Sequence, residues 1–357
     1  MRNINILDNH CHVCFPEAID DTVRGFEKVI EELHISEIGL LSCPLSSHSG
    51  VEVDILENLK VLYIKECLSI PVYAYASFIY HSDDGDSYAD FANKMLEMGF
   101  DGFKSLEQHP KNRKKIGKGL NDVSLDCFFD FIGEKKIPIV CHVGDPRRSW
   151  DIKTATESAK TLGRVYDNSF LSLDELYGEM DDLFRKHPDV PIVLAHFYFK
   201  SDDYDGLVKL METYPNVYLD FTPGTEMFLA FSEHIDMWRE FFLRYSKRLI
   251  FGSDLYGAGY GVNRHQLVRQ FLETSEPFEL MQRGDIVTPA NLPVEVLEDI
   301  YGGNVKRLLG NTPKPINRQK VYEYCVDIAE NHADELNDIG KQNLETFLQF
   351  WRDKFNE

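Results

Sequence analysis

Two histidines one residue apart, His10 and His12, end an apolar run near the N-terminus. Residues i and i+2 of a β-strand project from the same face, so both imidazoles would point into the space beyond the end of such a strand. That arrangement can chelate a metal ion, although a single HxH pair is more often a pair of polar loop residues. The pair therefore indicates a metal site only if further ligands come from other parts of the chain.

Four other short apolar runs end in side chains that suit such a site. They are Lys104 in "GFKSLE", His142 in "IVCHVGD", His196 in "VLAHF" and Asp254 in "IFGSDL". Four imidazoles and a carboxylate form a nitrogen-rich ligand set, for which zinc is the first choice and manganese, iron and cobalt are alternatives. A bound ion would lower the pKa of water from about 16 toward about 7. Asp254 would accept the proton of that water and pass it to the leaving group.

These side chains need a scaffold that brings distant segments together. Short β-branched and aromatic runs lie at 5–13, 37–44, 71–78, 100–106, 137–144, 191–197, 216–222 and 248–255. Most are separated by segments with helical spacing, among them 18–33, 88–98, 125–134 and 173–186. Eight alternating units predict a (β/α)8 TIM barrel, whose active site lies at the carboxyl ends of the strands. A doubly wound open sheet is the alternative, but no glycine-rich nucleotide-binding motif follows the first strand.

Composition narrows the class of protein. With 357 residues, 43% of them hydrophobic, the chain can bury a large core. No apolar run approaches the roughly 20 residues of a transmembrane helix, and the N-terminus does not resemble a secretory signal, so we expect a cytoplasmic protein. The seven cysteines follow no framework of spacings, which favours reduced thiols. A net charge of −21 argues against nucleic acid or an anionic membrane as partner and leaves a small-molecule substrate.

The ordered motifs resemble the amidohydrolase superfamily, specifically the "amidohydrolase 2" group of metal-dependent hydrolases. The resemblance covers about residues 3–310. It rests on His10-Cys11-His12, His142, His196, Asp254 and the closing segment "YGGNVKRLLG" at 301–310. It implies a (β/α)8 fold and a catalytic divalent metal, with Asp254 as both ligand and proton shuttle.

The resemblance implies two alternative metal arrangements. In the one-metal arrangement His196 polarises the substrate or orients the water, and the ion is held by His10, His12, His142 and Asp254. In the two-metal arrangement a carboxylated Lys104 bridges both ions, and His142 and His196 bind the second. We favour one ion, because "KSLEQHP" has two more residues between the lysine and His-Pro than a related group of amidohydrolases has. The ammonium of Lys104 would then meet a substrate carboxylate or a neighbouring acid.

The loops supply candidates for substrate contact. The insertion at 145–171 carries Arg147, Arg148, Trp150 and Tyr166, and the last two strand exits add Thr222, Glu226, Tyr256 and Tyr260. Arginine forks clamp carboxylates, although Arg147 and Arg148 could instead pair with surface acids. The basic segment 111–118 is expected to be a solvated loop. The predicted function is hydrolysis of a small carboxylated ester, lactone or amide. A decarboxylase of the same group and a non-catalytic metal-binding barrel are the two alternatives.

The last part of the chain differs in kind. After a barrel domain at 1–310, residues 311–357 carry apolar side chains at helical spacing with many acids between them. We expect a helical extension that packs on the barrel or, in a homo-oligomer, on a partner subunit. Its buried face would include Phe347, Phe350 and Trp351.

Overall fold

The computed structural model describes residues 2–13, 18–45, 53–78, 87–224, 226–257, 261–280 and 284–356. Of the candidate substrate contacts, Tyr260 lies outside the described residues.

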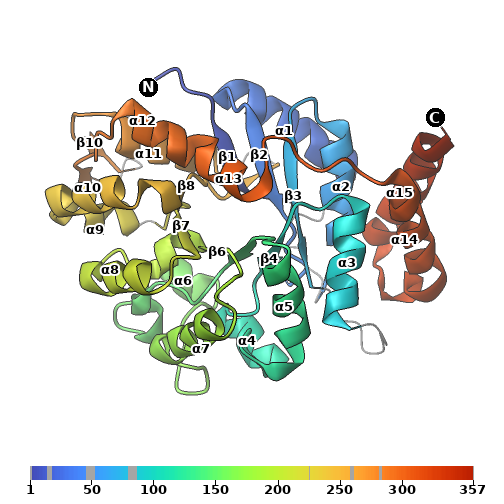
Figure 1. Ribbon diagram of the computed structural model, residues 1–357, viewed down its shortest axis with the longest axis horizontal. Helices are drawn as coiled ribbons and strands as arrows, with labels where there is room; N and C mark the ends of the chain where they lie inside the picture. Colours follow the sequence, from blue (N-terminus) through green and yellow to red (C-terminus); the bar gives the residue numbers. More distant parts are fainter. Residues whose placement is uncertain are drawn as a thin grey trace.

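Short strands alternate with helices and form one curled parallel sheet (Figure 1). Its strands, in the order β8-β7-β6-β5-β4-β3-β2-β1-β9, are β1 Leu7–His12, β2 Glu37–Leu41, β3 Val72–Ser77, β4 Gly102–Ser105, β5 Ile139–Cys141, β6 Ile192–Leu194, β7 Val217–Asp220, β8 Leu249–Ile250 and β9 Leu255–Tyr256. A separate antiparallel pair consists of β10 Phe278–Glu279 and β11 Ile286–Val287. The parallel β/α fold of a TIM barrel is therefore confirmed.

The helices lie outside the sheet (Figure 1). They are α1 Ile19–Leu33, α2 Glu57–Cys67, α3 Tyr88–Met98, α4 Pro110–Ile116, α5 Asp126–Glu134, α6 Glu157–Thr161, α7 Leu173–Lys186, α8 Tyr204–Thr213, α9 Met227–Glu233, α10 Ile235–Arg244, α11 Val262–Glu273, α12 Val294–Glu298, α13 Asn304–Leu309, α14 Arg318–Asn331 and α15 Asp338–Asn356. The predicted helices at 88–98 and 173–186 have the predicted bounds. Both begin with a serine capping box, which satisfies the first free backbone amides.

The barrel closes differently from the prediction, because the expected strand 248–255 is two short strands. β8 pairs with β7, and β9 pairs with β1 on the other side. Between them Asp254 has φ 59°, a left-handed conformation that interrupts an extended ladder. The amide of Asn9 still donates to the carbonyl of Phe251 at 3.1 Å. This one segment thus joins the two edges of the sheet and carries Asp254 into the barrel mouth.

The core has two parts, as expected for a sheet curled on itself. One cluster fills the barrel interior and contains Leu7, Leu41, Tyr73, Tyr75, Val140, Val193, Ala195, Ile250 and Val305. A larger cluster joins the outer face of the sheet to the helices. The side chains of Leu308 and Leu309 pack against the inner cluster, and Tyr73 donates to the Gly310 carbonyl at 2.9 Å. Helix α13 therefore covers the amino ends of the strands and leaves the carboxyl ends for chemistry.

The C-terminal helices α14 and α15 lie beside α2 and α3 (Figure 1). Phe347 and Trp351 are fully buried, and the rings of Phe347 and Phe350 lie 5.2 and 4.6 Å from the ring of Tyr63. The extension thus packs on the barrel within one chain. Its separation as a domain at 311–357 stays a prediction. Across the described part of the chain, no helix is both long and apolar enough to cross a membrane.

Candidate active site

A cavity of about 360 Å³ opens at the carboxyl ends of the strands. Eight residues expected from the sequence line it: His12, Lys104, His142, Arg148, His196, Glu226, Asp254 and Tyr256. His10 lies directly beneath, only 1% exposed, with its Nε2 3.4 Å from the Nζ of Lys104. The fold therefore brings the segments that end in these side chains to one place.

Three of these residues form a compact ligand group. Donor atoms of His10, His12 and Asp254 all lie within 4.8 Å of one another. The two imidazole rings meet edge to face at 4.8 Å, and His12 Nε2 lies 3.2 Å from Asp254 Oδ1. Two imidazoles and one carboxylate suit zinc, manganese, iron or cobalt. The residues present therefore fit a divalent ion.

Neighbouring side chains orient both histidines. His10 Nδ1 donates to Asp220 Oδ2 at 2.7 Å, and His12 Nδ1 lies 3.1 Å from the sulfur of Cys43. In His10 this leaves Nε2 with its lone pair, as the outer contacts of metal-binding histidines usually do, whereas the contact with Cys43 fixes the ring of His12 with Nε2 toward Asp254. Sequence reasoning missed Asp220 and Cys43, because only the folded sheet places the ends of β7 and β2 beside β1.

Charged neighbours shift the pKa values of all three ligands. Burial acts to raise the pKa of Asp254, but its contact with His12 and the guanidinium of Arg264 hold that pKa well below its usual range. Arg264 comes from α11 and donates to Asp254 Oδ2, a contact that the sequence did not indicate. Burial together with Lys104 lowers the pKa of His10. Burial also opposes a charge on His12, but Cys43 and Asp254 raise its pKa to about 9, so an ion would displace a proton there.

His196 and His142 face each other across the cavity floor. His196 Nε2 lies 3.2 Å from His142 Nδ1. His196 opens a run of four residues with φ between 50° and 60°, a conformation that costs roughly 1–2 kcal/mol for each residue other than glycine. The turn is held because the His196 amide donates to Asp220 at 2.8 Å and Tyr177 donates to the Tyr198 carbonyl at 2.9 Å. In this turn the ring of Phe199 stacks on the ring of His196, with 5.0 Å between the ring centres.

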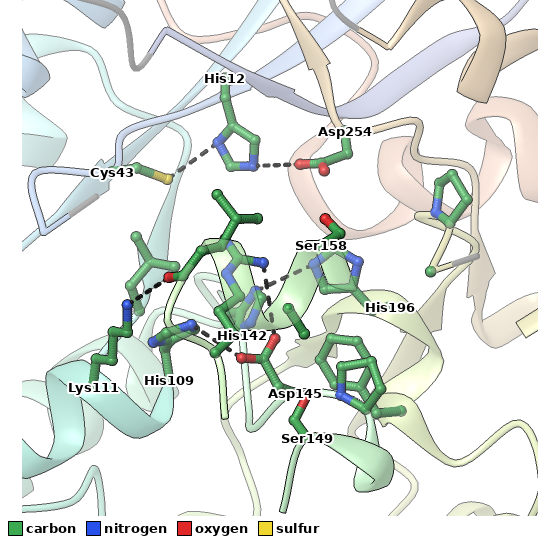
Figure 2. A pocket seen from close by; sticks show the side chains of 18 of the residues that line it. His12, Cys43, His109, Lys111, His142, Asp145, Ser149, Ser158, His196 and Asp254 are labelled. Carbon is green, nitrogen blue, oxygen red and sulfur yellow. Dashed lines mark hydrogen bonds and ion pairs between the residues drawn. The ribbon is translucent and has the colours of Figure 1, made fainter. Parts of the chain in front are cut away.

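A second ligand group lies on the opposite side of the cavity (Figure 2). Donor atoms of His109, His142 and Asp145 also lie within 4.8 Å of one another. His109 precedes α4, and Asp145 follows His142 by three residues. Sequence reasoning missed His109 and Asp145 as ligands, although the pairs His-Pro and Asp-Pro a few residues after the ends of β4 and β5 could have indicated them.

The loop candidates divide into two sets. Arg148 and Glu226 line the cavity as an ion pair at 2.6 Å, and the ring of Tyr256 lies 5.2 Å from that of His12. Of the other candidates among the described residues, none lines the cavity; these are Arg147, Trp150, Tyr166 and Thr222. Arg147 forms an exposed pair with Asp174 at 3.2 Å, as the surface alternative predicted.

Three further candidates are buried or half-buried outside the cavity and contact the segments that form it. Trp150 Nε1 donates to the Leu171 carbonyl at 2.9 Å, and Thr222 is fully buried beside Gly252, which follows β8. Tyr166 is 2% exposed and donates its hydroxyl to Asp145. Their contacts indicate that they hold the loops in place.

Comparison with known proteins identifies the family. Residues 57–310 match the family described as Amidohydrolase (Amidohydro_2), which is more than half of the chain. The chain belongs to the amidohydrolase family. The match begins after β1, so the placement of His10 and His12 in this amidohydrolase rests on the geometry above. No curated protein matches the chain.

Solved structures share the fold of this amidohydrolase. A putative amidohydrolase from Staphylococcus aureus is 12% identical with TM-score 0.54 and coverage of 86% of this chain and 100% of its own. The 5-carboxyvanillate decarboxylase from Sphingomonas paucimobilis is 12% identical with TM-score 0.52 and coverage of 86% and 99%. The 4-oxalomesaconate hydratase from Rhodopseudomonas palustris is 14% identical with TM-score 0.50 and coverage of 91% and 98%. At these identities the likeness shows the fold alone.

Proposed function

We propose that this amidohydrolase is a metal-dependent enzyme that decarboxylates a small organic acid. The observation that carries the proposal is a buried ammonium, that of Lys104, beside the ligand group of His10, His12 and Asp254. The group would hold one divalent ion. When bound, the ion would supply Lewis-acid polarisation of a substrate oxygen.

Lys104 supports a carboxylate as the substrate group. Its side chain is 1% exposed, and within the described part of the chain its Nζ contacts His10 Nε2 at 3.4 Å and forms no ion pair with a carboxylate. A buried charge is costly unless an opposite charge pairs with it. A substrate carboxylate beside His10 would provide that charge.

Asp254 supports decarboxylation over hydrolysis. One of its oxygens faces His12 and the other accepts from Arg264, and both contacts lower the pKa of Asp254 and so favour its ionised form over its protonated form. The carboxylate is thus better placed as a ligand than as the base that hydrolysis requires. The decarboxylase and the hydratase among the solved structures agree with a non-hydrolytic reaction on the same scaffold.

Hydrolysis of a carboxylated ester, lactone or amide is the second candidate. The family match favours it, since the family is described as Amidohydrolase. It would need Arg264 to release Asp254 when substrate binds.

Product analysis separates these reactions. Metal-loaded protein would be incubated with ¹³C-carboxyl-labelled aromatic and aliphatic acids and with carboxylated esters and lactones, and products followed by NMR. Labelled carbon dioxide supports decarboxylation, whereas cleaved esters or lactones without it would refute it in favour of hydrolysis. Lys104→Met should raise KM for the substrate about 10- to 100-fold, the value of a hydrogen bond to a charged group. Arg147→Ala, in the exposed pair, is the control with unchanged KM. An unchanged KM in Lys104→Met would refute the assigned role of the ammonium.

A further inference from the structure

We propose that the barrel mouth holds a second, separate divalent ion at His109, His142 and Asp145. Two imidazoles and a carboxylate suit zinc, manganese, ferrous iron or cobalt. The inference deepens the proposed function, because this ion would share the cavity of the first group. It differs from a lysine-bridged pair of ions, because Lys104 is not among its ligands.

The geometry supports an open site. The three donor atoms lie within 4.8 Å of one another, and all three side chains line the cavity. Figure 2 shows them on the side opposite His12 and Asp254. Three protein ligands leave coordination positions open, and because all three ligands line the cavity, a substrate oxygen could reach an ion held there.

Outer contacts orient His142 and Asp145 as in known metal sites. The Gly144 carbonyl lies 3.1 Å from His142 Nε2, so a proton on that nitrogen leaves Nδ1 with the lone pair, which an ion would take in place of the contact with His196 Nε2 at 3.2 Å. Tyr166 donates to the carboxylate of Asp145, and His109 Nε2 lies 3.4 Å from the same oxygen. Arg164 stays 4.0 Å from the other oxygen, which keeps that oxygen free of a direct hydrogen bond.

The protonation states agree with this geometry. Burial, together with His196 and His109, lowers the pKa of His142, which keeps its imidazole neutral. Burial acts to raise the pKa of Asp145, but His109, Arg164 and Tyr166 hold it below its usual value. A neutral imidazole and an ionised carboxylate are the forms that bind metal.

The basic segment 111–118 holds this group in place, and the expectation of a solvated loop there is wrong. Most of it forms α4, which begins directly after His109. Arg113 donates to Glu179 of α7 at 2.7 Å. Lys111 donates to the Leu162 carbonyl at 2.9 Å and Lys114 to Ser169 at 2.6 Å, so both bind the insertion that follows Asp145. The elements that carry His109 and Asp145 are thereby fixed to each other.

Metal stoichiometry tests the proposal. Purified protein would be saturated with zinc, separated from free ion by gel filtration, and analysed by plasma mass spectrometry as equivalents per chain. We expect about two equivalents in the wild type, and about one in His109→Ala and in Asp145→Asn. Arg147→Ala, on the same insertion, should retain two. His109→Gln repeats the test with a polar side chain, and thermal unfolding checks that each variant is folded.

The reciprocal variant His10→Ala/His12→Ala should keep one equivalent, held by the second group. One equivalent in the wild type, or an unchanged count in folded His109→Gln and Asp145→Asn, would overturn the second site. If in that case the His10/His12 variant binds no zinc, the proposed function stands. If instead that variant keeps the full wild-type count, the metal of the proposed function fails on its own.

Discussion

Replacement of Asp220 by Asn should weaken metal binding while it leaves the fold intact. The carboxylate accepts three hydrogen bonds: from His10 Nδ1 at 2.7 Å, from the His196 amide at 2.8 Å and from the Thr222 amide at 3.1 Å. An asparagine has only one oxygen. If that oxygen keeps the two backbone amides, the new NH₂ group faces His10 Nδ1 and cannot accept its proton.

The consequence for His10 is a change of tautomer. Nδ1 would become the acceptor and Nε2 would carry the proton, on the side that faces the ligand group. Loss of an outer contact of this kind typically lowers metal affinity 10- to 100-fold, which is about 1.4–2.7 kcal/mol. The metal-free protein should lose less stability than this, because burial raises the pKa of Asp220 and the substitution removes a buried charge.

The assay is a zinc titration against a chelating dye, with apparent Kd measured for wild type, Asp220→Asn and a control. Asp174→Asn is the control, because Asp174 carries only an exposed pair with Arg147. Urea unfolding of the metal-free proteins shows whether each variant is folded. An unchanged Kd in Asp220→Asn would refute the reasoning, since it would mean that Asp220 does not set the tautomer of His10.

Three further predictions follow from single contacts. Gly252→Ala should cost about 1–3 kcal/mol of unfolding free energy, because the new Cβ would lie 2.5 Å from Thr222 Oγ1 and 2.7 Å from His10 Cβ; unchanged urea stability would contradict this. Burial lowers the pKa of His196 to about 4 from an unfolded value of about 6.5, so its contribution is complete above pH 6.5 and is lost as the pH falls through 4. The free energy of unfolding should therefore fall by roughly 3 kcal/mol. Urea unfolding of the metal-free protein measures it, and equal values at pH 4 and pH 7 would contradict the prediction. Asp254→Asn should lower thermal stability, because the contacts with His12 and Arg264 favour the ionised carboxylate, and should abolish turnover through loss of a metal ligand; an active variant would remove Asp254 from the reaction.

Much of the fold could be predicted because its signals are local. Alternating apolar runs and helical segments indicate a barrel, and the strand ends indicate where His10, His12 and Asp254 meet. The prediction that His142 joins them is not met, because its donor atom lies with those of His109 and Asp145. The last strand could not be predicted, because its break depends on the left-handed backbone of Asp254 and on the closure between β7 and β1.

The rest of the site could not be predicted, because it depends on contacts between segments far apart in the chain. Arg264 reaches Asp254 from the following helix, and Asp220 joins β7 to β1 and to the turn at His196. His109 and Asp145 meet only because α4 and the insertion pack on each other. No sequence periodicity predicts such pairs, and an HxH motif does not indicate which distant residues complete the site.

Anomalous diffraction from a crystal grown with zinc is the most direct test of the central claim, which is that His10, His12 and Asp254 form a catalytic metal centre. Data collected on both sides of the zinc absorption edge should show a peak bound by His10, His12 and Asp254, at about 2.0–2.2 Å from their donor atoms. The absence of a peak at this position would contradict the account, whatever the remaining cavity binds.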